Sequence, residues 1–131
     1  MHYYLTVGAT LLTTYIFGSL YYLVVGKSWR KALGWKENEQ EPYRPKPLEL
    51  VVAFILQFIL VVCMFWVFNK LQPQTLSHTL SYGFLIWFGL ILPTLSTNVV
   101  FQRRNVNLIL IDGSHWLLLL LIISAMYFLF S

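Results

Sequence analysis

Asp112 and His115 are the two residues whose types and spacing suggest chemistry most directly. Both lie in an apolar stretch, and Asp112 is the one acidic residue well inside such a stretch. A spacing of three places both side chains on one face of a helix. Ionisable groups inside a membrane can relay a proton or hold a metal. One aspartate and one histidine are too few ligands for a metal site, so the sequence predicts no metal and no other cofactor.

A structural role explains Asp112 equally simply. If a helix begins near Leu108, the carboxylate lies about one turn inside it. There it interacts favourably with the helix dipole and can pair with Arg103 or Arg104 in the preceding short loop. We therefore expect the structural role to come first and the chemical one to be the alternative.

Pro93 interrupts the preceding apolar stretch and predicts a local kink there. Proline lacks a backbone donor and clashes with the previous turn of a helix. We expect the side chains of Asp112 and His115 to point toward this kink, with His115 bonding Asn98 or Ser96. The candidate intramembrane polar site thus comprises Asp112, His115, Asn98 and Ser96.

The composition indicates that these residues are held by membrane-spanning helices. The chain has 131 residues, of which 58% are hydrophobic and 11% charged, whereas soluble domains carry about 25% charged residues. Four stretches are long enough to span a bilayer, which takes about 20 apolar residues. Continuous apolar runs favour helices over alternating barrel strands. We predict an all-α fold, a membrane-embedded four-helix bundle in one domain, residues 1–131, with helices at about 3–25, 48–68, 79–101 and 108–130.

The distribution of basic residues predicts the orientation of the bundle. Loops one and three hold eight of the nine Lys and Arg residues, and the opposite face holds only Lys70. Basic loops face the cytoplasm. We therefore expect a multi-pass protein of the cell (inner) membrane, with loops one and three cytoplasmic and both termini outside. The basic residues of the two loops are Lys27, Arg30, Lys31, Lys36, Arg44, Lys46, Arg103 and Arg104.

A ridge of small residues runs along the first stretch at intervals of four: Thr6, Thr10, Thr14 and Gly18. Small residues allow helix backbones to approach closely, and Thr hydroxyls can bond across the contact. We expect this ridge to pack inside the bundle; the alternatives are a dimerisation face and a polar track.

The segment from Gly26 to Gly34 is predicted to be a short amphipathic segment lying in the inner membrane interface. Lys27, Arg30 and Lys31 in this segment are candidate contacts for anionic lipid headgroups. The simpler interpretation is that they only anchor the chain by their positive charge.

Four short motifs point to a known family. They are Phe17–Tyr22, Gly26–Gly34, Pro93–Thr94 and Leu108–Gly113. Their types and order resemble the uncharacterised domain-of-unknown-function family 1761, which consists of small bacterial membrane proteins with four predicted helices. This chain has Tyr21-Tyr22 where the family usually has Trp-Tyr. The resemblance implies the fold and no mechanism, because the family has no established activity.

These observations favour a structural or accessory membrane protein that associates with itself, as a homo-oligomer, or with another membrane protein. Membrane lipids are expected partners, and nothing indicates nucleic acid. The alternative is a small solute or proton transporter or channel oligomer that uses Asp112 and His115. No nucleophile-and-base triad, phosphate loop or paired-carboxylate motif indicates an enzyme; lipid-modifying activity is the third hypothesis.

Overall fold

The computed structural model describes residues 2–36 and 45–131, and most of these residues are helical. Arg44, counted above among the basic residues of loop one, lies outside the described residues. In chain order the elements are α1 (His2–Ala32), α3 (Pro47–Leu71), α4 (Leu76–Ile86), the π-helical turn η1 (Trp87–Ile91), α5 (Leu92–Phe101) and α6 (Asn107–Phe130).

The helices make this a multi-pass membrane protein, as predicted. Four helical spans are long and apolar enough to cross a bilayer, the third being α4, η1 and α5 taken together as Leu76–Phe101. Their bounds follow local signals in the sequence. Thr75 caps α4 by accepting a 3.0 Å hydrogen bond from the His78 backbone N–H, and α3 ends where Gln72 adopts a left-handed φ of 49°. The predicted all-α four-helix bundle is confirmed.

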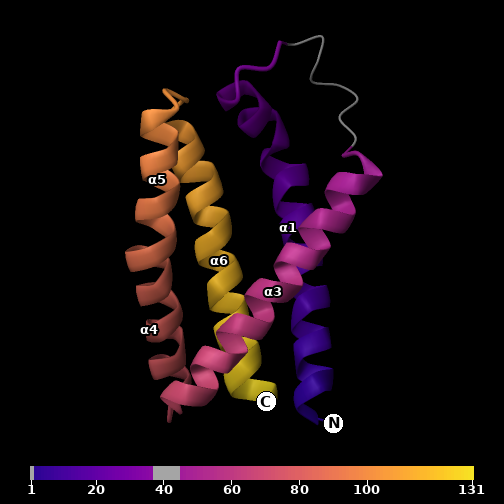
Figure 1. Ribbon diagram of the computed structural model, residues 1–131, viewed down its shortest axis with the longest axis vertical. Coiled ribbons are helices and arrows are strands. Elements are labelled where there is room, and N and C mark those ends of the chain that lie inside the picture. Colours follow the sequence, from indigo (N-terminus) through magenta and orange to yellow (C-terminus); the bar gives the residue numbers. More distant parts are fainter. Residues whose placement is uncertain (1, 37–44) are drawn as a thin grey trace.

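Both termini lie at one end of the molecule, and the α5–α6 loop lies at the other (Figure 1). At the terminal end, the Thr6 hydroxyl donates a 2.9 Å hydrogen bond to the Phe130 carbonyl, which joins α1 to α6. Helix α6 packs against α1 and also against α4 and α5. It is therefore the central helix that positions residues from the other spans.

The main core fills the half of the molecule near the termini. Phe65 and Phe68 of α3 are fully buried there against Leu119 and Ile123 of α6. A smaller apolar cluster of Ala32, Val99 and Leu108 joins α1, α5 and α6 at the opposite end.

Helix α3 belongs to the core over only part of its length. Its buried residues all lie between Val61 and Phe68, whereas residues 45–56 are exposed. Figure 1 shows α3 crossing the molecule diagonally from beside α6 to the outer side of α1. In this outer half it contacts α1 through Tyr15, whose hydroxyl donates to the Leu50 carbonyl at 3.2 Å and whose ring meets that of Phe54.

The segment expected to lie in the interface is instead the end of α1. The helix continues without a break to Ala32, and the left-handed φ of 84° at Gly34 follows it. Trp29 and Leu33 pack against the small cluster of Ala32, Val99 and Leu108. Because their apolar face is covered by α5 and α6, these residues extend a spanning helix and form no separate amphipathic segment.

The proline in the third span is accommodated by a π-turn. In this turn the Leu92 N–H bonds the Trp87 carbonyl, five residues back, just before Pro93. The wider turn relieves the crowding between the proline ring and the preceding carbonyls. Pro93 and Gly89 are exposed, so this distortion faces outward.

Candidate functional site

A large groove separates α1, the outer half of α3 and α6. Its volume is about 1430 Å³, and its walls come from α1 between Thr14 and Arg30, from α3 between Leu50 and Leu60, and from α6 between Asp112 and Trp116. We call this cavity the inter-helix groove. The groove exists because the outer half of α3 diverges from α6 and leaves the facing sides of α1 and α6 uncovered.

Asp112 lies in the wall of the inter-helix groove and is held by α1. The Tyr22 hydroxyl donates a 2.5 Å hydrogen bond to Oδ1 of Asp112. The neighbouring Tyr21 hydroxyl donates a 2.6 Å bond to the Ile111 carbonyl. Two adjacent tyrosines therefore attach α1 to the first turns of α6.

His115 sits within a cluster of aromatic rings at the same level. Its ring stacks with that of Phe17 at 5.9 Å between centroids and lies 5.0 Å from Tyr22 and 4.8 Å from Trp116. A Cβ atom built on Gly18 would lie 3.1 Å from Nε2, so glycine makes room for the imidazole. The side chain is buried, and among the described residues its Nδ1 has no hydrogen-bond partner.

Further polar groups reach the groove from other elements. Gln57 of α3 lines it, and the Gln57 Nε2 atom is buried without a partner in the described part of the chain. Arg30 of α1 and Arg104 of the α5–α6 loop also line it. Together with Asp112 they make the groove partly charged, whereas most of its remaining wall is apolar.

The ridge of small residues on α1, which we call the threonine ridge, positions this helix against α6. Thr6, Thr10 and Thr14 are buried, and Gly18 reaches His115. The same four-residue interval then continues to three more positions along α1, namely Tyr22, Gly26 and Arg30. A row spaced by four winds slowly around a helix, by about 40° per step. Four members of the extended row, Thr14, Gly18, Tyr22 and Arg30, line the inter-helix groove.

Most of the chain matches a single protein family. The family described as "Protein of unknown function (DUF1761)" matches residues 5–127. The chain belongs to this family. The comparisons with curated proteins and with solved structures gave no match.

In this DUF1761 protein, two of the motifs that carried the resemblance face each other. Tyr21 and Tyr22 of the segment 17–22 donate hydrogen bonds to Ile111 and Asp112 of the segment 108–113. The family motifs therefore meet at the wall of the inter-helix groove, although Tyr22 is 90 residues from Asp112.

The four residues of the expected polar site are divided between two places. Asp112 and His115 line the groove, whereas Ser96 and Asn98 of α5 do not. Asn98 is exposed and Ser96 half-buried. The face of α6 that carries Asp112 and His115 is turned toward α1, so the partners come from the first span. Among the described residues, no three His, Cys, Asp or Glu side chains gather as metal ligands.

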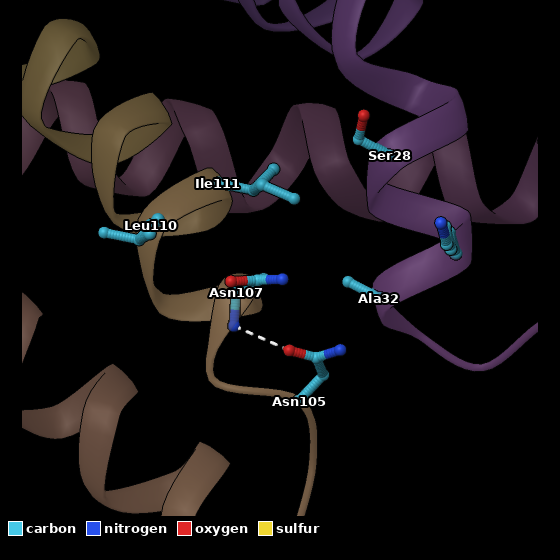
Figure 2. A pocket seen from close by; sticks show the side chains of 7 residues that line it. Ser28, Ala32, Asn105, Asn107, Leu110 and Ile111 are labelled. Carbon is cyan, nitrogen blue, oxygen red and sulfur yellow. Dashed lines mark hydrogen bonds between the residues drawn. The ribbon is translucent and has the colours of Figure 1, made fainter.

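The three candidate headgroup contacts also separate. Lys27 and Lys31 are exposed on α1, whereas Arg30 is buried, with its guanidinium group above Gly26. Lys31 lines a second, smaller cavity of about 370 Å³ between the end of α1 and the start of α6. Figure 2 shows Asn105 and Asn107 on one side of this cavity and Ser28 and Ala32 on the other, with the Asn107 N–H bonded to the Asn105 side chain.

Sequence reasoning missed Tyr22, Gln57 and Arg30 as parts of one site. The sequence drew attention to Tyr22 as part of a family motif and to Arg30 as a candidate headgroup contact. The signal that connects them was present, because both continue the four-residue row of the threonine ridge. No comparable pattern marks Gln57, whose place depends on the tilt of α3.

Proposed function

We propose that the protein has an accessory, non-catalytic role and performs it by holding another membrane component in the inter-helix groove. The supporting observation is that Gln57 and His115 line this groove, and that each has a buried polar atom, Nε2 and Nδ1 respectively, without a partner among the described residues. A buried polar atom without a partner costs about 1–3 kcal/mol, and no water in the bilayer core relieves it. A bound component can supply the missing partners.

Cross-linking in intact membranes tests this role. A photo-reactive amino acid is placed at Leu56, which lines the groove and is 60% exposed. The matched control carries it at Leu85 of α4, which is also 60% exposed and lies outside the groove lining. We expect Leu56 to give a discrete adduct that Leu85 does not give. Identical adduct patterns at the two positions would refute a groove occupant.

The identity of the adduct then distinguishes the kinds of association. A band of twice the chain mass indicates a second copy, a larger discrete band indicates another membrane protein, and a small mass increment indicates a lipid. Each of these outcomes supports an accessory role through the groove.

Transport is the second candidate function because Asp112 and His115 both line the groove. A path for ions needs to continue through the other half of the molecule. There Phe65 and Phe68 of α3 and Leu119 of α6 are fully buried and pack together. This packed layer favours the accessory role over conduction by a single chain.

A further inference from the structure

We infer that the inter-helix groove is a binding site for a phospholipid with an anionic headgroup. This inference rests on the proposed function and names the occupant of the groove. Three features support it: the distribution of polarity along the groove, its arginines and its unsatisfied polar atoms.

The polarity of the groove changes along the helices in the way an amphiphile requires. Arg30 lies in the last turns of α1, and Arg104 lies in the α5–α6 loop at the same end of the molecule. Leu60 and Ile91 line the groove closer to the main core. A lipid that enters with its headgroup at the arginines therefore extends its acyl chains along an apolar wall.

The charged groups favour an anionic head. The lining contains the guanidinium groups of Arg30 and Arg104 and the carboxylate of Asp112, so its formal charge is net positive. Guanidinium groups bind phosphate with two parallel hydrogen bonds. Basic pockets between spanning helices are a recognised setting for anionic lipid headgroups. A second helix of this chain would bring an apolar face and no phosphate to these arginines.

The unsatisfied atom on α3 fits the same occupant. Gln57 Nε2 carries hydrogens and has no acceptor among the described residues. The ester and glycerol oxygens of a phospholipid supply acceptors between the headgroup and the acyl chains. An acyl chain alone, such as that of a hydrocarbon, would leave this donor unpaired.

A lipid titration tests the headgroup preference. The full chain, purified in mild detergent and delipidated, is titrated with phosphatidylglycerol and with phosphatidylcholine of the same acyl chains, and binding is followed by native mass spectrometry. We expect tighter binding of phosphatidylglycerol. Arg104→Gln should weaken it about fivefold, the effect of one basic residue. The neighbouring Arg103→Gln, at a residue outside the groove lining, should leave the affinity unchanged.

A second pair of variants tests the acyl part of the site. Leu56→Trp adds a bulky ring to the groove wall and should reduce lipid binding, whereas Leu85→Trp on the outer surface of α4 should not. Glycerol phosphate, which has the charge and no acyl chains, should not compete with the lipid. Equal binding of both lipids, equal effects of Arg104→Gln and Arg103→Gln, or full competition by glycerol phosphate would overturn the inference.

The two proposals fail in different ways. A protein adduct at Leu56 together with no lipid preference would reject the lipid and retain an accessory role. The absence of any discrete adduct at Leu56 would reject the accessory role itself.

Discussion

The Tyr22 hydroxyl of α1 donates a hydrogen bond of 2.5 Å to Oδ1 of Asp112 on α6. This bond links the first and last spans near the end of the molecule that carries the α5–α6 loop, while the Thr6 hydroxyl links the same two helices near the termini. The α1–α6 pair is therefore fastened at both ends, and α3 can diverge from it without opening the fold.

Removing the Tyr22 hydroxyl should weaken this pair. Tyr22→Phe retains the ring that contacts His115 and leaves the Asp112 carboxyl without its donor. We expect a loss of about 1–3 kcal/mol in the free energy of unfolding, measured by denaturant titration in detergent. Tyr4→Phe is the control, because Tyr4 is on the same helix and 75% exposed. Equal stability of both variants would show that the bond contributes nothing.

The contact between α4 and α6 depends on Gly83. A Cβ atom at Gly83 would lie 2.2 Å from Oγ of Ser124 and 3.3 Å from the Leu120 carbonyl oxygen. Gly83→Ala should therefore force the helices apart and destabilise the protein by about 1–3 kcal/mol. At Gly89 a Cβ atom meets nothing within 4 Å, so Gly89→Ala should be neutral or slightly stabilising. Thermal unfolding that ranks the two variants in the opposite order would contradict the close approach.

The contact between α1 and His115 has its own test. Gly18→Leu should displace the imidazole and lower stability, because even a Cβ atom there lies 3.1 Å from Nε2. Gly8→Leu adds the same side chain to the same helix where nothing lies within 4 Å. Unchanged thermal stability of Gly18→Leu would mean that the ridge does not pack closely at this point.

The spans could be predicted because length and polarity determine them. An apolar run of about 20 residues has no stable alternative to a helix in lipid, and the structure has four helical spans long and apolar enough to cross a bilayer. The first of them continues to Ala32, beyond the end expected near residue 25. The threonine ridge was equally accessible from spacing alone. Its continuation through Tyr22, Gly26 and Arg30 could have been followed in the same way.

The groove could not be predicted, because it depends on how one helix tilts. Apolar residues cover α3 almost uniformly, so its sequence does not distinguish the half that packs on α6 from the half that diverges. The π-turn at Trp87–Ile91 is similar, since Pro93 predicts a distortion without specifying its form or direction. A partner of Asp112 was expected in the nearby loop, and Arg104 of that loop lines the same groove and interacts electrostatically with the carboxylate. The hydrogen bond to the carboxylate comes instead from Tyr22, 90 residues away, which the sequence did not indicate.

The orientation of the bundle in the membrane is a separate prediction. The structure places both termini at one end (Figure 1), and the basic residues of loops one and three predict that this end is outside. A reporter that works only in the cytoplasm, fused after Ser131, should be inactive, and one inserted between Arg103 and Arg104 should be active. Strong activity of the fusion after Ser131 would show that the termini are cytoplasmic and that the predicted orientation is wrong.

Asp112→Asn separates the accessory role from proton or solute transport. Asparagine retains the shape of the side chain and an oxygen that accepts the Tyr22 hydrogen bond, but it cannot take up and release a proton. If Asp112 is structural, the variant should keep the stability and the groove occupant of the wild-type chain. Proteoliposomes containing either protein should then hold a proton gradient as long as empty vesicles do, as followed with a pH-sensitive dye.

The transport hypothesis predicts the opposite result. If the wild-type chain dissipates the gradient and Asp112→Asn abolishes this flux while remaining folded and assembled, the carboxylate carries protons and the transport hypothesis replaces the accessory one. Ser114→Ala is the matched control, because Ser114 lies two residues away on α6 and is exposed outside the groove. Loss of flux in both variants would instead indicate a general disturbance of α6. The comparison is informative because Tyr22 keeps its hydrogen bond in either form of residue 112, so a change in flux cannot be attributed to loss of the α1–α6 contact.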